Sequence, residues 1–241
     1  MGKIKTVIFD LDGTMYDYVL CNRAGLDALE AYCGEQFGLE HRGFDEAFRL
    51  ADDNLQQRIG YSCASVHNRL IRFQCMLELL EKPLFPHALT MYHCYWDTFL
   101  AAMRPYEGLK ECLRHLNQRG LTTAVGTNMT AYVQYQKLEQ LEVTEFIRWM
   151  VTSEEAGTEK PDPGFYRLCI EKSKNRPEEC LFIGDHPQCD VAGPEQAGMQ
   201  ALLFRPLKAG TIPDGGNHRQ ITSFTELTGK TEGEYQDKEL F

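Results

Sequence analysis

The sequence has no apolar run long enough to cross a membrane and no cluster of lysine and arginine. A membrane-spanning helix needs about 18 or more apolar residues, whereas the first apolar run, Val7 to Phe9, ends at Asp10. The formal net charge of −10 is unfavourable for binding a polyanion. We therefore expect no membrane association and no nucleic acid polymer as a partner.

Metal-binding and disulfide patterns are also missing. The nine cysteines form no Cys-x-x-Cys pair, and the seven histidines form no His-Glu-x-x-His arrangement. These absences argue against a zinc site and against a disulfide scaffold. Because no signal peptide is recognisable either, we expect reduced thiols and a cytoplasmic location.

The 241 residues are enough for one or two domains, and their apolar pattern changes along the chain. Residues 16–103 have apolar side chains at helical spacing and predict four or five helices. Alternating strands and helices follow, with strands expected at 3–9, 121–126, 149–152, 180–183 and 200–204, and helices at 107–119, 131–141, 164–173 and 192–197. The repeated strand–helix units predict an α/β fold, a Rossmann-like doubly wound parallel sheet with an inserted α-helical domain.

The domain limits follow from these changes of pattern. Residues 1–15 and 104–241 form the expected α/β core, and residues 16–103 form the inserted helical domain. The polar tail beyond Gly229 is expected to fray.

Three apolar runs of the expected sheet end in polar residues. Asp10 follows the first run, Thr127 and Asn128 follow the second, and Asp185 follows Leu181 to Gly184. Right-handed crossovers bring the carboxyl ends of parallel strands to one edge of the sheet. These side chains are therefore expected to share a site.

The residues at this edge suit phosphoryl chemistry. Asp10 and Asp12 form a carboxylate pair in which one member is a nucleophile and the other a proton donor and acceptor. Asp10, Asp185 and a backbone carbonyl form an all-oxygen ligand set that suits Mg²⁺. Lys160 and Thr127 would bind the phosphoryl oxygens.

Four ordered segments then show a resemblance to a known family. Asp10-Leu-Asp-Gly-Thr14, Thr127-Asn128, Lys160-Pro161 and Gly184-Asp185-His-Pro-Gln-Cys-Asp190 resemble the motifs of the haloacid dehalogenase-like superfamily. Residues 16–103 resemble the helical C1-type cap of its nucleotide 5'-phosphatase, N-acylneuraminate phosphatase and phosphoglycolate phosphatase branch.

This resemblance implies a role for each residue. Asp10 would be the nucleophile and a Mg²⁺ ligand, and Asp12 the acid/base, with its carbonyl on the metal. Thr127 and Lys160 would bind phosphate, and Asp185 would be the other metal ligand. Asp190 would orient Lys160 or a metal-bound water.

Some residues have two interpretations. Asn128 is a candidate for phosphate binding, and Thr14 and Asp17 are candidate site residues, but each of the three could instead cap a helix or stabilise a turn. His186 contacts the substrate or is a bystander. Arginines of the helical insert reach the substrate or are merely solvated: Arg23, Arg49, Arg58, Arg69 and Arg72.

The function expected is hydrolysis of a small phosphorylated metabolite, such as a nucleotide or sugar phosphate, through an aspartyl-phosphate and with Mg²⁺, by a monomer or homodimer. Asp12 argues against a dehalogenase or a phosphonatase, which would be expected to lack it. A phosphomutase and a catalytically silent binding module remain as alternatives.

Overall fold

The computed structural model describes residues 3–206 and 219–228, and the predicted tail beyond Gly229 lies outside them. The chain forms two compact units. The α/β unit contains Met1–Asp17, Arg104–Asn128 and Leu141–Phe241, and the helical unit contains Tyr18–Met103 and Met129–Gln140. No helix among the described residues is long and apolar enough to cross a membrane.

The α/β unit is built on a parallel sheet, as the alternating pattern predicts. Its strands are β1 (Thr6–Phe9), β2 (Thr122–Thr127), β3 (Met150–Thr152), β4 (Cys180–Gly184), β5 (Gln200–Phe204) and β6 (Gln220–Ile221). They lie in the order β3-β2-β1-β4-β5-β6. The order reverses at β1, because β2 lies on one side of it and β4 on the other, and such a switch point is where doubly wound sheets bind ligands. Strand β6 has only two residues and was not predicted.

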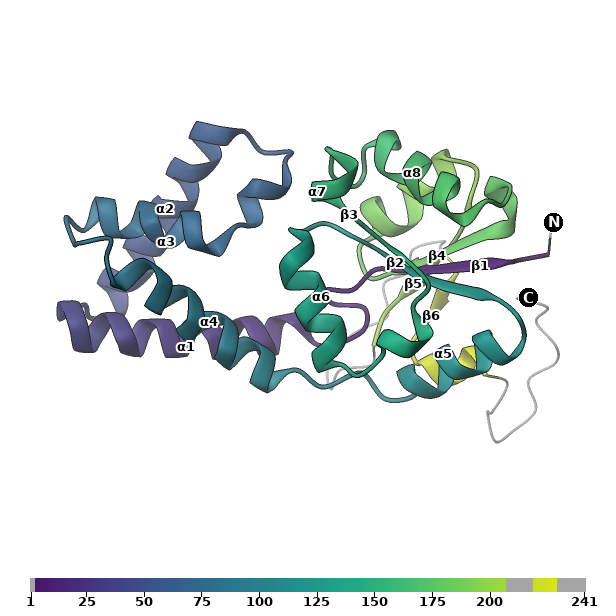
Figure 1. Ribbon diagram of the computed structural model, residues 1–241, viewed down its shortest axis with the longest axis horizontal. Helices are drawn as coiled ribbons and strands as arrows, with labels where there is room; N and C mark the ends of the chain where they lie inside the picture. Colours follow the sequence, from purple (N-terminus) through teal and green to yellow (C-terminus); the bar gives the residue numbers. More distant parts are fainter. Residues whose placement is uncertain (1–2, 207–218, 229–241) are drawn as a thin grey trace. The chain divides into compact units, whose positions relative to one another are not determined.

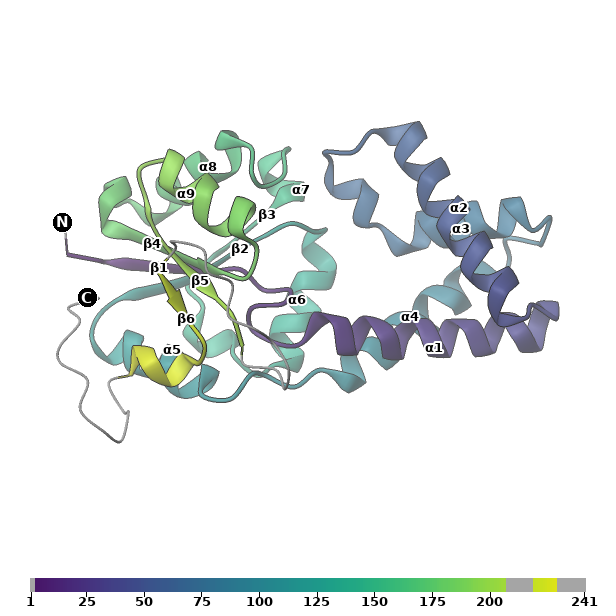
Figure 2. The same cartoon turned by 180° about the vertical axis from the view of Figure 1, so that it is seen from behind.

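Helices cover both faces of this sheet. Helix α5 (Leu109–Gln118) and the 3₁₀ turn η5 (Phe224–Leu227) lie on one face, and α8 (Pro163–Ser173) and α9 (Gly193–Gln196) lie on the other (Figures 1 and 2). Shorter elements connect them: η2 (Thr144–Phe146), α7 (Ser153–Ala156), η3 (Pro177–Glu179) and the π-helical turn η4 (Pro187–Ala192).

Strand β1 is buried along its whole length because it lies in the middle of this sandwich. Ile8 packs in the cluster that contains Phe165 and Phe182, and its neighbour Phe9 packs against Phe224, with ring centroids 6.1 Å apart. Successive strand residues point to opposite faces of the sheet. The apolar residues packed on each face therefore fix the position at which β1 ends.

Residues 18–103, all of which the structure describes, contain four α-helices, within the predicted four or five. They are α1 (Tyr18–Phe37), α2 (His41–Ile59), α3 (Arg69–Leu79) and α4 (His87–Ala102), with the 3₁₀ turn η1 (Ala64–His67) before α3. Helix α1 packs on α4, and α2 packs on α3.

One helix groups differently from the sequence-based domain limits. Helix α6 (Ala131–Gln140), expected as part of the α/β core, belongs to the helical unit. The fully buried Lys137 of α6 explains this grouping, since its Nζ lies 5.4 Å from the ring centroid of Trp96 and 5.3 Å from that of Phe99. Aromatic faces attract such a cation. The spacing of apolar residues along the sequence gives no sign of this contact between distant residues.

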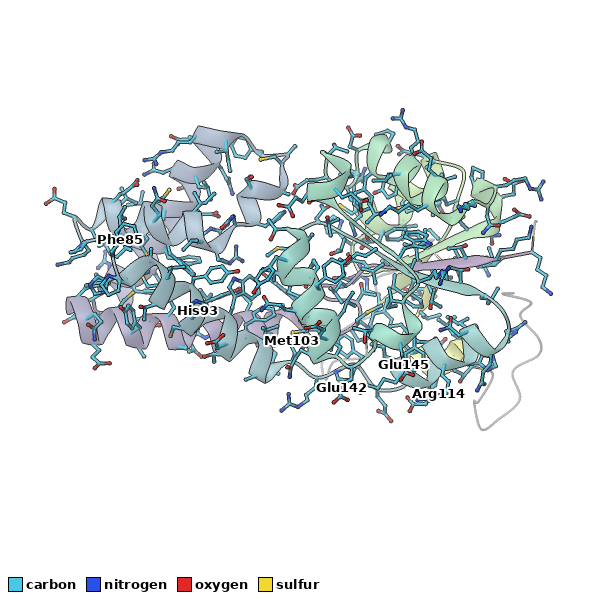
Figure 3. The ribbon with its side chains drawn as sticks, viewed as in Figure 1. Phe85, His93, Met103, Arg114, Glu142 and Glu145 are labelled. Atoms are coloured by element: carbon cyan, nitrogen blue, oxygen red, sulfur yellow. The ribbon has the colours of Figure 1, made fainter. Side chains whose placement is uncertain are left out.

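We predict that Phe182→Ala lowers the free energy of unfolding by about 3–5 kcal/mol, because it opens a cavity under β1 and α8. The measurement is urea unfolding, and the matched control is Phe85→Ala, whose side chain is exposed (Figure 3). The control should change stability by no more than about 0.5 kcal/mol. Equal effects of the two substitutions would contradict this assignment of the core.

Candidate active site

The strand register brings the predicted polar residues to one edge of the sheet. Phe9, the last residue of β1, pairs with Val125 of β2 and Ile183 of β4. Asp10 continues the ladder by one bond, since its backbone N–H donates to the Ile183 carbonyl at 2.8 Å. Thr127 ends β2 and Asp185 follows β4, so the side chains after these three strands share the switch point.

A buried lysine joins two of the aspartates. The Lys160 Nζ donates to Asp10 Oδ1 at 2.7 Å, to Asp190 Oδ1 at 2.7 Å and to the Gly126 carbonyl at 3.2 Å. All three ammonium hydrogens are therefore used, which a buried ammonium group requires. Burial opposes the charge on Lys160, but attraction to Asp10 and Asp190 outweighs it and raises the lysine pKa.

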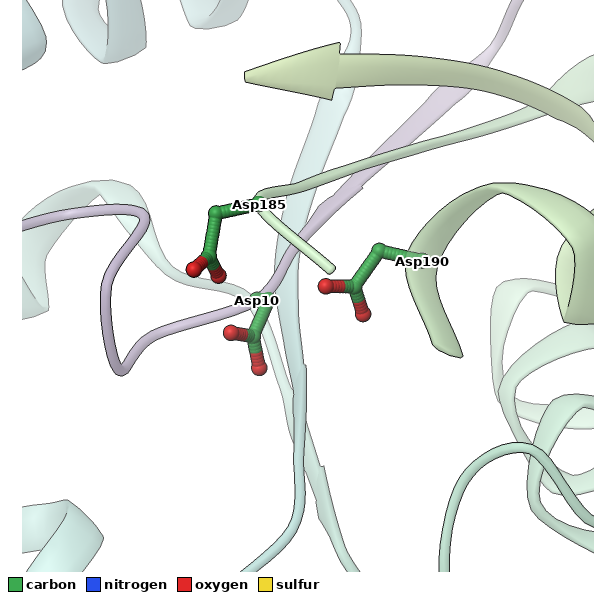
Figure 4. A group of neighbouring side chains, drawn as sticks. All are labelled: Asp10, Asp185 and Asp190. Atoms are coloured by element: carbon green, nitrogen blue, oxygen red, sulfur yellow. The ribbon is translucent and has the colours of Figure 1, made fainter. Parts of the chain in front are cut away.

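Three carboxylates lie close together at this edge of the sheet (Figure 4). Asp10, Asp185 and Asp190 each have a ligand oxygen within 4.8 Å of the others. One lysine neutralises only part of their charge. Burial raises the pKa of Asp10 to about 8, and repulsion from Asp190 and Asp185 overcomes part of the effect of Lys160. Burial, followed by repulsion from Asp190, also raises the pKa of Asp185.

The loop after β1 supports this cluster. The buried Thr14 hydroxyl donates to Asp185 Oδ1 at 3.1 Å and lies 3.5 Å from Asp10 Oδ2. Gly13 has a φ of +87°, and a Cβ at this position would lie 2.6 Å from Asp185 Oδ2. A side chain here would therefore be strained and would displace the carboxylate.

Asp190 is held in the π-helical turn η4. Its Oδ2 accepts the His186 N–H at 2.9 Å, and Nδ1 of the His186 ring accepts the Cys189 N–H at 3.3 Å. The His186 side chain thus caps η4. The backbone of Gly184 lies so close to Asp190 that a Cβ would overlap the carboxylate.

Asp12 contacts a residue that the sequence analysis did not select. Its Oδ1 accepts a hydrogen bond from the hydroxyl of Tyr16, a fully buried side chain. Tyr16 also forms backbone bridges to Asp12 and Pro105. The sequence analysis assigned Tyr16 to the helical insert, and a spacing of four residues in a loop gave no reason to pair the two side chains.

Asn128 has backbone partners in this structure. Its Oδ1 accepts the Lys160 N–H at 2.9 Å, and its Nδ2 donates to the Lys160 carbonyl at 3.2 Å. Asn128 thus fixes the backbone of Lys160, and phosphate binding by Asn128 or by the buried Thr127 remains a prediction. Asp162 fixes the next segment, because its side chain accepts the Gly164 N–H at 2.7 Å and begins α8.

The residues present suit a hard divalent cation. All the donors of the cluster are carboxylate oxygens, and Lys160 leaves an excess of negative charge among them. Mg²⁺ prefers such oxygens. Asp190 is the poorer ligand, since its two oxygens accept short hydrogen bonds from Lys160 and the His186 N–H, whereas the second hydrogen bond of Asp10, from Thr14, is long at 3.5 Å.

Comparison with known proteins finds relatives that belong to one family of hydrolases. Residues 4–198 match the model of the haloacid dehalogenase-like hydrolases. The ribulose-1,5-bisphosphate 5-phosphatase of Halopiger xanaduensis is 31% identical, covering 96% of this chain and 97% of the relative. The human N-acylneuraminate-9-phosphatase is 23% identical over 94% of this chain and 93% of its own. The crystal structure of a 2-haloacid dehalogenase from Pseudomonas syringae shares the fold, with a TM-score of 0.73, 22% identity and coverage of 93% and 96%.

We predict that the metal-free protein loses stability as the pH rises from about 4 to 8. The folded Asp10 has a pKa of about 8 and the unfolded one the ordinary value of 3.8, so only the folded state keeps the proton in this range. The slope is at most about 1.4 kcal/mol per pH unit. The free energy of unfolding of Asp10→Asn should depend less on pH, whereas that of the control Asp53→Asn, at an exposed residue, should follow the wild type. Urea unfolding in a chelator at several pH values measures this, and parallel curves for wild type and Asp10→Asn would contradict it.

Proposed function

The chain belongs to the haloacid dehalogenase-like hydrolases, and we propose that it is a Mg²⁺-dependent phosphatase that hydrolyses small phosphorylated metabolites through an aspartyl-phosphate on Asp10. The observation that best supports this is the contact of Asp10 with Lys160 beside Asp185 at the switch point. A buried carboxylate fixed by a cation, with further carboxylates beside it, is suited to attack phosphorus.

The proposed reaction has two steps, both at phosphorus. In the first, a carboxylate oxygen of Asp10 forms a bond to phosphorus while the bond to the leaving oxygen breaks, and Asp12 gives that oxygen a proton. In the second, water attacks phosphorus, Asp12 takes a proton from the water, and the bond to Asp10 breaks. Inorganic phosphate leaves, and both aspartates return to their starting states.

The other residues hold the reactants. Lys160 keeps Asp10 in place through Oδ1 and presents a positive charge that is fixed by Asp190 and Asn128. The Thr127 hydroxyl is proposed to donate to a phosphoryl oxygen. Mg²⁺, held by Asp10, Asp185 and the Asp12 carbonyl, would supply electrostatic stabilisation of the phosphoryl oxygens.

Asp12 separates this function from several alternatives. It provides the acid/base that phosphoryl transfer needs and that a dehalogenase or phosphonatase would not require. The Tyr16 hydroxyl donates a hydrogen bond to Asp12 Oδ1 and so orients this carboxylate. A fixed acid/base group supports an enzyme and argues against a catalytically silent binding module. A phosphomutase would use the same residues and would transfer the phosphate to a sugar instead of to water.

The small size of the substrate is also a proposal. The helical unit would act as the cap that the sequence predicts and would exclude bulk water and folded phosphoproteins. Two relatives are named for small phosphorylated substrates, ribulose-1,5-bisphosphate and N-acylneuraminate 9-phosphate. We propose the same class for this chain, and a cytoplasmic location agrees with it.

Asp10→Asn should abolish hydrolysis of p-nitrophenyl phosphate, because an amide is a poor nucleophile. Asp12→Asn should slow it by about 10²-fold or more, since both steps need proton transfer. The measurement is phosphate release in steady state, with the exposed Asp27→Asn as the control. Turnover by folded Asp10→Asn comparable to that of the control would remove Asp10 from the nucleophile role.

Removal of divalent metal should also stop hydrolysis. Exhaustive chelation followed by dialysis is expected to leave less than about 1% of the activity, and Mg²⁺ should restore it, whereas Ca²⁺ should not, because it favours longer bonds and more ligands. Activity is followed as metal is added back. Full turnover of the chelated protein would show that the acidic cluster works without a metal.

A further inference from the structure

Helix α8 and the π-helical turn η4 are joined by a tyrosine that takes no direct part in the proposed reaction. Tyr166 lies in α8, and its side chain is fully buried. Its ring packs against those of Phe165 and Phe182, with centroids 5.6 and 6.1 Å away. Its hydroxyl donates a hydrogen bond to the backbone carbonyl of Cys189 in η4. The ring and the hydroxyl therefore have separate partners.

The Cys189 carbonyl lacks the donor that a π-helical turn normally provides. In a π-helix each carbonyl accepts the N–H of the residue five positions later, and the Gly193 N–H follows this pattern by donating to the Gln188 carbonyl. The same pattern would pair Cys189 with residue 194, which is a proline and has no N–H. An unpaired carbonyl is costly to bury, so the Tyr166 hydroxyl replaces the donor that Pro194 cannot supply.

The surroundings of this hydroxyl are matched to it. The backbone of Gly193 lies so close to Tyr166 that a Cβ at position 193 would overlap the hydroxyl. Burial raises the pKa of Tyr166, so the hydroxyl keeps its proton and remains a donor. The packing thus provides room for a tyrosine hydroxyl at this place as well as for an aromatic ring.

The hydrogen bond from Tyr166 fixes one peptide group of η4. The Cys189 carbonyl and the Asp190 N–H belong to the same planar peptide group. That N–H donates to the His186 carbonyl at 2.7 Å, so both ends of the group are held. The orientation of the peptide determines where the Asp190 side chain leaves the backbone, and the buried Asp190 carboxylate accepts the Lys160 ammonium at 2.7 Å.

We propose that Tyr166 is a positioning residue for the reaction at Asp10. Its hydroxyl fixes the peptide group before Asp190, and Asp190 in turn holds Lys160 against the nucleophile. Reactive groups must be held within about 0.5 Å of their productive positions, so a small rotation of this peptide group is enough to slow the attack on phosphorus. The inference rests on the proposed function, and it adds a residue that lies outside the group of charged side chains.

Tyr166→Phe removes the hydroxyl and keeps the packed ring. We expect kcat for p-nitrophenyl phosphate with Mg²⁺ to fall by about 10-fold, the value of one buried hydrogen bond, while KM changes by less than about 2-fold. The effect falls on kcat because the position of the nucleophile changes and the binding of the substrate does not. A kcat within about 2-fold of the wild type in folded Tyr166→Phe overturns the proposal.

Thr123→Val is the matched control, because it also removes a buried hydroxyl that donates to a backbone carbonyl. The Thr123 hydroxyl donates to the Phe146 carbonyl, and Thr123 pairs with Val7, which precedes Asp10 by three residues. Urea unfolding should show a similar loss of stability in both variants, whereas only Tyr166→Phe should lose activity. Equal losses of kcat would show a general effect of destabilisation and would overturn the positioning role.

Binding of vanadate tests the route through Asp190 without turnover. Vanadate mimics the five-coordinate phosphorus of the transition state, and calorimetry with Mg²⁺ measures its affinity. Tyr166→Phe should weaken binding by about 10-fold in the wild-type background and by less than about 3-fold in the Asp190→Asn background, because the two changes act on the same contact. A 10-fold loss in both backgrounds would show that Tyr166 acts independently of Asp190 and would overturn the proposal.

The proposed function and the positioning role can fail separately. Hydrolysis by the wild type with an unchanged kcat in Tyr166→Phe overturns the positioning role alone. No hydrolysis by the wild type, together with vanadate binding that depends on Tyr166 only when Asp190 is intact, would refute the phosphatase and retain the positioning of the site by Tyr166. Absence of both hydrolysis and vanadate binding would refute both.

Discussion

The Lys160 ammonium between Asp10 and Asp190 is the interaction on which the α/β unit is organised. It joins the end of β1 to the turn after β4, and it reaches β2 through the Gly126 carbonyl. A buried ion pair gives little net stability by itself, because its desolvation offsets much of the attraction. Its effect here is to position three segments of the chain. Burying one of these charged groups without its partner would raise the free energy of the folded state, so the three segments must meet at this lysine. Gly13 and Gly184 have no side chains, which leaves room for the carboxylates of Asp185 and Asp190 beside their backbones.

The same contact links the fold to the chemistry we propose. The apolar layers on both faces of β1 determine where that strand ends, and Asp10 is the next residue. Asn128 holds the Lys160 backbone, and Asp162 begins α8 directly after it. Positions of the reactive groups therefore derive from backbone hydrogen bonds and buried strands, which are the least mobile parts of such a domain.

Much of this could be predicted from the sequence because the evidence for it is local. Apolar runs that end in Asp10, Thr127 and Asp185 indicate strand ends, and parallel topology then brings them together. Contacts between distant residues have no such local sign. Asn128 and Lys160 are 32 residues apart, and the Tyr16 side chain reaches Asp12 only through the particular path of one loop.

The arginines and α6 show the same limit in the helical unit. All five arginines were candidates because they lie within the helical insert, yet packing between helices buries only Arg69 and Arg72. Helix α6 has an apolar period like its neighbours, and the aromatic surroundings of Lys137 decide its grouping. Periodicity identifies an element, whereas tertiary packing decides which unit the element joins.

The grouping of α6 also bears on how such a protein can change in evolution. The chain passes between its two units four times, at residues 17–18, 103–104, 128–129 and 140–141. A domain inserted at one point could be lost or exchanged in a single genetic event. Here the loss of 18–103 would leave Lys137 without its aromatic neighbours on α4, so a viable exchange would have to replace α6 as well. The two stretches are thus expected to be inherited together and to vary in a correlated manner.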